Sequence, residues 1–128
     1  MSNFQHTVQT ARSFEDAVKS VEQKSAEKGF RVLYTHNFAA TLAEKGFARE
    51  PLKVVEICNA SYANEVLQKD VNIAVMLPCP IAVYTKDGGT FISTMRPSAI
   101  TDFYPDSGIK DIAAAVEKTV LEIVNESR

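Results

Sequence analysis

Two cysteines, Cys58 and Cys79, are the residues of this chain best suited to chemistry. Cys58 ends an apolar run at residues 52–58, and Asn59-Ala60-Ser61 directly after it signals the start of a helix. Cys79 stands between two prolines, just before a run at 80–85 that is typical of a strand. A helix N-terminus favours the thiolate form of a nearby cysteine, whereas a buried cysteine acts as a small apolar filler. The sequence leaves both interpretations open.

A partnership between the two thiols depends on the fold, because their separation is far wider than in a Cys-x-x-Cys motif. If the strands at 52–58 and 80–85 are neighbours, both thiols reach the same end of one sheet. They would then form a redox or sulfur-handling pair, or hold a ligand or soft metal as thiolates. The alternative is two buried small residues at strand ends.

Polar candidates surround the cysteines in the sequence. Glu56 is two residues before Cys58 on the predicted strand, so we expect both on one face. The carboxylate would act as an acid or base beside the thiol, or simply pair with a basic residue of an adjacent strand. The residues we expect to contact a ligand are Cys58, Cys79, Glu56, Asn59, His36 and Tyr34.

A metal site would need the histidines as well. His6 and His36 lie on apolar-rich faces of the first two predicted strands, so they could share a side of the sheet. With the two cysteines they would form a Cys2His2 set, but none of the four occurs in the close pairs usual in structural zinc sites. We therefore expect no metal and no cofactor.

Periodicity predicts three helices and about five strands. The helices are expected from Ser13 to Gly29, over 62–69 and from about 106 to the C-terminus, with a shorter helical stretch at 39–45. The strands are expected at 4–10, 30–38, 52–58, 80–85 and 90–95, with a hairpin turn at 86–89, and residues 73–77 are ambiguous. In the second strand we expect Phe30, Val32, Tyr34, His36 and Phe38 to share a face. This order predicts one two-layer α+β domain over residues 1–128.

Composition limits the function. The chain has 128 residues and a net charge of −2, and its pI is about 5.7, which argues against a nucleic-acid partner. The N-terminus shows no secretory signal, and the longest uncharged run, 71–85, is too short and too rich in breakers to span a bilayer. We expect no membrane partner, and a cytoplasmic protein whose thiols are reduced.

Three segments resemble the uncharacterised family described as the domain of unknown function number 302. They are 54–59 with Tyr62-Ala63 and Leu67, 77–84 around Cys79, and the 14–17 helix start leading to Gly29-Phe30. The resemblance covers nearly the whole chain. It implies a curved, mainly antiparallel sheet with helices on one face, often paired as a homodimer, and supplies no activity. The chain departs from the family pattern at Ala60, where proline is common.

Three functional hypotheses follow. The first is a homodimeric binding or accessory module with a small-molecule pocket beside the cysteines. In it, Cys58 is the reactive or ligand-contacting thiol. The second is a thiol-dependent enzyme for sulfur transfer or disulfide redox chemistry, which needs a thiolate with an acid or base in reach. The third is a purely structural or partner-binding homodimer. Whether the chain is an enzyme stays open, with the binding module preferred.

Overall fold

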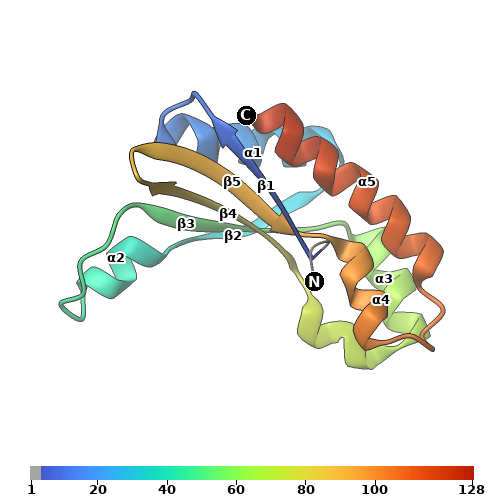
Figure 1. Cartoon of the computed structure of the whole chain (residues 1–128). Helices are drawn as coiled ribbons and strands as arrows, with labels where there is room; N and C mark the ends of the chain where they lie inside the picture. The colour runs from blue at the N-terminus through green and yellow to red at the C-terminus, as the bar shows by residue number, and fades with distance from the viewer. Residues whose placement is uncertain (1–3) are drawn as a thin grey trace.

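The protein consists of one antiparallel sheet with helices on one side (Figure 1). The structure is a computed structural model, and it describes residues 4–128. The strands are β1 (Gln5–Thr10), β2 (Arg31–Asn37), β3 (Leu52–Cys58), β4 (Cys79–Lys86) and β5 (Gly89–Met95). The α-helices are α1 (Phe14–Glu27), α2 (Phe38–Ala43), α3 (Ala60–Lys69), α4 (Ile100–Phe103) and α5 (Lys110–Ser127), and two 3-10 helices are η1 (Val71–Met76) and η2 (Pro97–Ala99).

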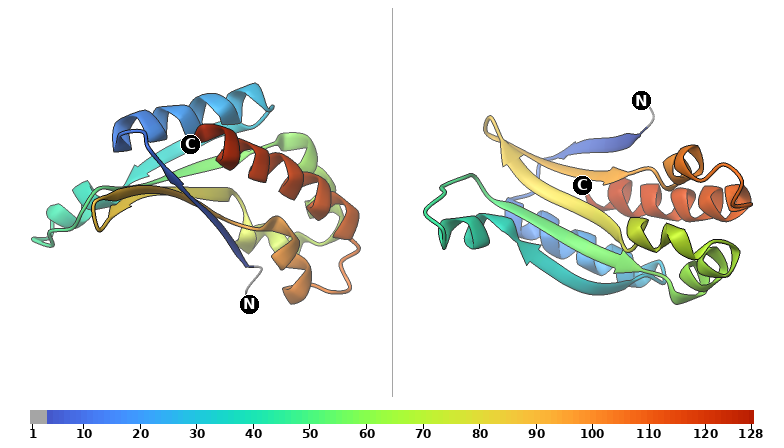
Figure 2. Two further views of the ribbon diagram at one scale, coloured as in Figure 1. Left: turned by 45° about the horizontal axis from the view of Figure 1, so that its top comes forward. Right: turned by 90° about the horizontal axis from the view of Figure 1, so that it is seen from below.

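The strand order is β1-β5-β4-β3-β2, and every neighbouring pair is antiparallel. The sheet arches strongly. Helices α1 and α5 lie on its convex side, α3, η1 and α4 close one end, and the concave side carries no helix across its middle (Figures 1 and 2). The predicted α+β class, with its antiparallel sheet and long C-terminal helix, is confirmed.

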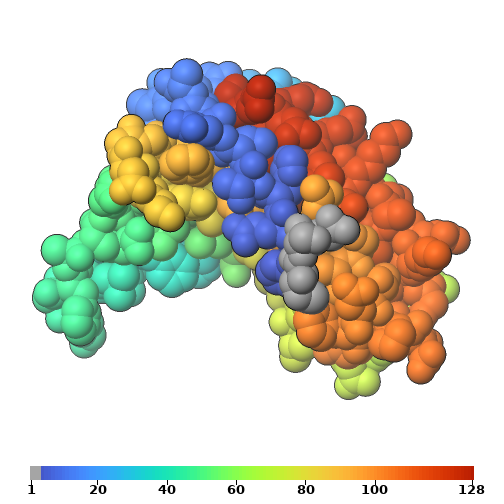
Figure 3. All heavy atoms as spheres, in the orientation of Figure 1, coloured from blue at the N-terminus to red at the C-terminus, as the bar shows by residue number. Residues whose placement is uncertain are grey.

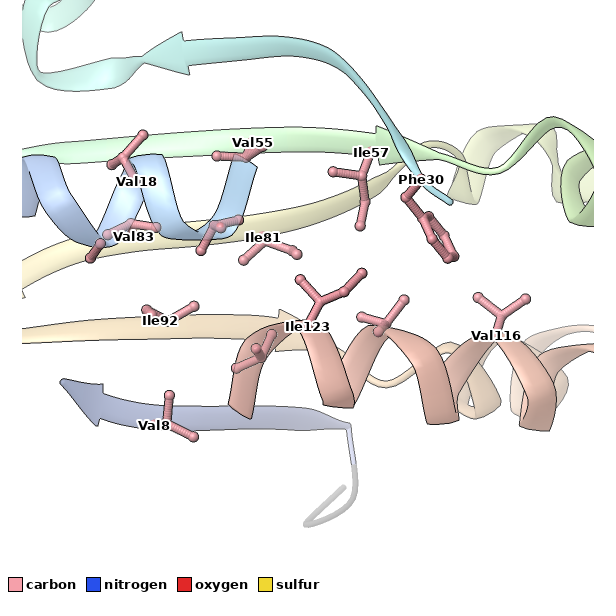
Figure 4. Close-up of a cluster of buried hydrophobic side chains, with 14 residues drawn as sticks. Val8, Val18, Phe30, Val55, Ile57, Ile81, Val83, Ile92, Val116 and Ile123 are labelled. Carbon is pink, nitrogen blue, oxygen red and sulfur yellow. The ribbon is translucent and has the colours of Figure 1, made fainter. Parts of the chain in front are cut away.

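The main core lies between the sheet and the helices α1 and α5. Ser13 caps α1 by accepting a hydrogen bond from the Asp16 amide, as the sequence predicted. Apolar residues at helical spacing on α1 and α5 meet alternate residues of the strands (Figure 4). The fully buried members include Val21, Val55, Ile57, Ile81, Val83, Ile92, Val120 and Ile123.

A second, smaller core lies at the closed end of the sheet. Val66 of α3, Ile73 of η1 and Ile100 of α4 pack with Ile109 and Ala113 at the start of α5. This cluster fixes α3 against α5, which places two helices over the ends of β3 and β4. It therefore forms the frame of the site described below.

The β4–β5 hairpin is as predicted. Lys86 pairs with Gly89, and the two turn residues, Asp87 and Gly88, have φ angles of 51° and 82°. Two successive positive φ angles match the twist of antiparallel strands, and Asp-Gly is a favoured pair for such turns.

Two local predictions need correction. A β-bulge between Val32 and Tyr34 shifts the register of β2, so residues 30–38 do not share one face. Phe30 and Val32 pack against the main core, whereas Tyr34 and His36 lie on the concave side beside Glu56. An extra residue in one strand reverses which side chains face the core.

The second correction concerns the last helix and the ambiguous segment. Helix α5 begins at Lys110 rather than near Asp106, and no side chain caps it. The ambiguous residues 73–77 fall mostly in the 3-10 helix η1, which Asp70 caps through the Asn72 amide. In the described part of the chain, no helix has the length and apolar character needed to cross a membrane.

Candidate functional site

An apolar cavity of about 40 Å³ lies where the ends of β3 and β4 meet α3 and α5. Including its open mouth, the hollow measures about 500 Å³. Both cysteines and Asn59 line it, together with aromatic and aliphatic residues from several segments of the chain. The lining residues are Phe30, Ile57, Cys58, Asn59, Tyr62, Ala63, Val66, Leu77, Pro78, Cys79, Pro97, Ile100, Ile109, Ala113 and Val116.

The β3–β4 ladder brings the two thiols to this cavity. Strands β3 and β4 are neighbours, which is the condition that the sequence analysis set for the two thiols to meet. Ile57 of β3 is paired directly with Cys79 of β4. Cys58 is the next residue along β3 and pairs with Arg31 of β2. Both cysteines are free thiols and half-buried. The sheet therefore places the two sulfur-bearing side chains at one end, on the wall of a single cavity.

Burial changes the acidity of Cys79. The pKa of this thiol is raised from 9.0 to about 11, mainly because a thiolate loses its hydration there and to a smaller extent because Cys58 is nearby. At pH 7 a thiol with that pKa is ionised in about one molecule in ten thousand. Cys79 therefore behaves as an apolar, polarisable wall of the cavity.

Asn59 has a structural task at the cavity edge. Its side-chain oxygen accepts a hydrogen bond from the Tyr62 amide and caps α3, while its side-chain nitrogen donates to the Gly29 carbonyl at 3.1 Å. Both ends of this amide are thus engaged by backbone. Asn59 fixes the start of α3 and joins it to the turn before β2.

The helices supply lining residues that the sequence-based argument did not place at the site. Tyr62 and Ala63 come from the first turn of α3, and Ala113 and Val116 come from α5. The Tyr62 ring packs near Phe30, with 6.3 Å between ring centroids. In the sequence, the only sign of these lining positions is that small residues lie within the apolar stripes of both helices. The tertiary packing is needed to show that Ala63 and Ala113 face the same cavity.

Three predicted site residues lie elsewhere, on the concave side of the sheet. His36 Nε2 lies 2.9 Å from Glu56 Oε1, and the Tyr34 ring lies 4.6 Å from the His36 ring. The phenyl ring of Phe38 is 5.9 Å from the same histidine. This group is separate from the cavity, so the six predicted residues form two clusters and not one. Glu56 is the partner of His36 and not of Cys58.

The two histidines do not meet either. His6 Nε2 is 2.8 Å from Asn125 Oδ1 of α5, on the helix-covered side, whereas His36 lies on the concave side. Among residues 4–128, no cluster of three or more histidine, cysteine, aspartate or glutamate side chains is arranged to hold a metal ion.

The fold and the cavity together define a small two-layer α+β domain with one antiparallel sheet, a helix-covered convex side and an apolar hollow at one end. The chain belongs to the family described as the domain of unknown function DUF302, whose pattern matches residues 6–127.

A crystal structure of an uncharacterized conserved DUF302 protein from Bacillus stearothermophilus superposes with a TM-score of 0.92 at 28% sequence identity, covering 98% of each chain. No curated protein matches the chain. The resemblance stated from the cysteine segments is thus confirmed, and it brings a fold without an assigned activity.

Proposed function

We propose that the protein is a binding module that takes a small apolar group into the cavity between β3, β4, α3 and α5. The supporting observation is the composition of the cavity wall. Apart from the Asn59 amide and the Tyr62 side chain, it consists of hydrocarbon and two thiols. Apolar lining with few polar groups is typical of small-molecule sites.

The size of the cavity restricts the ligand. A cavity needs a volume of roughly 10–15 Å³ to hold a single water molecule. The cavity volume of about 40 Å³ therefore accepts only a few non-hydrogen atoms. The ligand would therefore insert a slender apolar portion, such as a short alkyl or thioether chain, and leave any polar portion at the open mouth. The polarisable sulfur atoms of Cys58 and Cys79 suit contact with such a chain.

Binding is favoured over catalysis because the wall holds no carboxylate, imidazole or amine. A thiol-dependent enzyme needs an acid or base within hydrogen-bond reach of a thiolate. Glu56 and His36, which the sequence suggested for that task, bond to each other on the concave side. The raised pKa of Cys79 also opposes its use as a nucleophile.

The proposal includes a cytoplasmic homodimer. Two free thiols suit a reducing compartment. Pairing is supported by helix α2, in which no residue is buried within the single chain.

The cavity can be tested by titrating the isotope-labelled protein with straight-chain alcohols of increasing length. The chemical shifts of the backbone amide signals in solution report the binding. We expect saturable shifts centred on Tyr62, Ala63, Cys79 and Ala113, and tighter binding with each added carbon until the cavity is full. Shifts that never saturate, or that concentrate around His36 and Glu56, would refute the proposed site.

A further inference from the structure

The concave side of the sheet holds a second hollow, here called the concave pocket, at the β4–β5 hairpin. Its volume is about 290 Å³, and its lining includes Gln9, Tyr84, Lys86, Asp87, Gly89 and Phe91. On β1, β4 and β5, buried Val8, Val83 and Ile92 face the helices, so their strand neighbours face the concave side. The space-filling view shows that side as the hollow of an arch (Figure 3). The concave pocket shares no lining residue with the apolar cavity beneath α3.

Two stacked aromatic rings form part of the wall of the concave pocket. Tyr84 and Phe91 are paired directly across β4 and β5, and their ring centroids lie 5.6 Å apart with 22° between the ring planes. Both side chains are half-buried, so part of each ring stays exposed. A flat ligand inserted between two rings holds them about 7 Å apart, twice the contact distance of carbon atoms. The Tyr84–Phe91 pair is too close for that, so a ligand packs on the outside of the pair.

A glycine opens the floor of the concave pocket. Gly89 pairs with Lys86 at the end of the hairpin. A β-carbon at Gly89 would lie 2.9 Å from Nε2 of Gln9 and 3.1 Å from a ring carbon of Phe91, which is closer than ordinary van der Waals contact. The absence of a side chain at Gly89 thus lets the Gln9 amide and the Phe91 ring edge meet at one point. A ligand at that point contacts a polar group and an apolar surface together.

Polar side chains of three kinds border the aromatic rings. They are the amide of Gln9, the ammonium of Lys86 and the carboxylate of Asp87, and all three residues are exposed. Lys86 and Asp87 take part in none of the ion pairs formed among residues 4–128. An amide supplies donors and an acceptor, an ammonium supplies donors and a carboxylate accepts. The two charges cancel, so the concave pocket offers both kinds of hydrogen bond without attracting an anion or a cation.

We infer that the concave pocket binds a neutral carbohydrate, with the face of one sugar ring against the Tyr84–Phe91 pair and its hydroxyl groups bonded to the three polar side chains. A sugar ring carries C–H groups on its faces and hydroxyl groups around its edge, and each hydroxyl both donates and accepts. This combination matches an aromatic wall bordered by an amide, an ammonium and a carboxylate. The inference goes beyond the apolar ligand proposed for the cavity beneath α3 and does not depend on it.

Two other classes of ligand fit the concave pocket less well. A phosphorylated ligand is held by net positive charge, which the Lys86–Asp87 combination does not supply. A flat aromatic ligand would have to separate Tyr84 from Phe91 in order to stack on both rings. The volume of about 290 Å³ lies at the lower end of the roughly 300–1,000 Å³ typical of small-molecule pockets, so a single sugar ring is the expected occupant.

The inference can be tested by titrating the isotope-labelled protein with the methyl glycosides of glucose, galactose and mannose. We expect at least one of them to give saturable amide shifts centred on Gln9, Asp87 and Phe91, with a dissociation constant of about 1 mM or weaker, as suits a small ligand in an open site. Sorbitol is the control, because it has similar hydroxyl groups but no rigid ring face. It should give no saturable shift.

Two matched pairs of variants test the aromatic and the polar contacts. Phe91→Ala should weaken glycoside binding at least about tenfold, whereas Phe47→Ala, which removes an exposed phenyl ring outside the concave pocket, should leave binding unchanged. Gln9→Ala at an exposed position should weaken binding several-fold, whereas Gln23→Ala on exposed α1 should not. Circular dichroism of each variant confirms that it is folded.

A third variant acts on the floor of the concave pocket alone. Gly89→Ala keeps every polar group and both rings, but its methyl group displaces the Gln9 amide and the Phe91 ring edge. We expect weakened glycoside binding in a folded protein. Ala113→Val, which fills the apolar cavity beneath α3, should leave glycoside binding unchanged.

Several outcomes would overturn the inference. One is the absence of saturable shifts with all three glycosides up to about 100 mM, far above the expected dissociation constant. A second is equal binding of sorbitol, which would show that no ring is recognised. A third is tighter binding of indole than of any glycoside at these residues, which would assign the concave pocket to flat aromatic ligands. Glycoside binding that survives Phe91→Ala and Gln9→Ala unchanged would place the sugar elsewhere.

Discussion

Glu56 and Cys58 are two residues apart on β3, yet their side chains belong to different parts of the protein. Glu56 Oε1 lies 2.9 Å from His36 Nε2 on the concave side, whereas Cys58 lines the cavity beneath α3. The β3–β4 ladder ends at the Ile57–Cys79 pair, so Cys58 lies one residue beyond the last pair with β4, next to the start of α3. Cys58 is still paired with Arg31 of β2, but past the end of the β4 ladder it borders the cavity instead of another residue of β4.

Filling the cavity should abolish ligand binding without unfolding the protein. Ala113→Val adds two methyl groups at a buried position of the cavity wall. We expect loss of the saturable alcohol binding, with a change in unfolding free energy within about 1–2 kcal/mol, typical of mild overpacking.

The matched control is Ala115→Val on the exposed side of the same helix. It introduces the same loss of helix propensity outside the cavity, so binding should be retained. Unchanged binding in Ala113→Val would place the ligand elsewhere.

The raised pKa of Cys79 predicts a particular dependence of stability on pH. The folded thiol ionises at about pH 11 and the unfolded thiol at about 9, so above pH 9 the unfolded state loses its proton first. This contribution to stability is complete below pH 9 and falls between pH 9 and 11, by up to about 3 kcal/mol.

Denaturant unfolding of wild type and Cys79→Ala across that range measures the effect. The difference in unfolding free energy between the two proteins should shrink as the pH rises from 9 to 11. A difference that stays constant would show that Cys79 ionises in the folded protein as it does in the unfolded chain.

Asn59 should act through the structure and not through a ligand. Asn59→Ala removes the cap of α3 and the bond to the Gly29 carbonyl, so we expect a loss of about 1–2 kcal/mol in unfolding free energy. Asn59→Asp keeps the capping oxygen and should lose less. If Asn59→Ala keeps full stability but eliminates alcohol binding, Asn59 is a ligand contact.

The His36–Glu56 pair should contribute little to stability and nothing to the cavity. Both side chains are partly exposed, at 41% and 31%, and exposed ion pairs contribute about 0–1 kcal/mol. We therefore expect Glu56→Gln to change the unfolding free energy by less than about 1 kcal/mol and to leave alcohol binding unaltered. Weakened binding in this variant, with the fold intact, would connect the two clusters.

Much of the fold could be predicted from the sequence because local signals coincide with it. Ser13 does cap α1, Asp87-Gly88 does form the hairpin turn, and the long apolar stripe of α5 does face the sheet. The sequence predicted that Cys58 and Cys79 would lie at the same end of the sheet only if β3 and β4 were neighbours. The structure shows that these two strands are paired.

Other parts of the site could not be predicted, because they depend on contacts between distant segments. The bulge after Val32 moves Tyr34 and His36 to the concave side, and a regular alternation of residue types gives no sign of it. The cavity wall likewise combines Tyr62 with Ala113, and such a pairing depends on the packing of α3 against α5.

The most direct test of the cavity is a crystal of the protein held under xenon pressure, since dry apolar cavities take up this atom. We predict one strong xenon peak between Cys58, Cys79 and Tyr62, present in wild type and absent from crystals of Ala113→Val. Ordered waters in that position, or xenon bound only outside the cavity, would contradict an apolar ligand site.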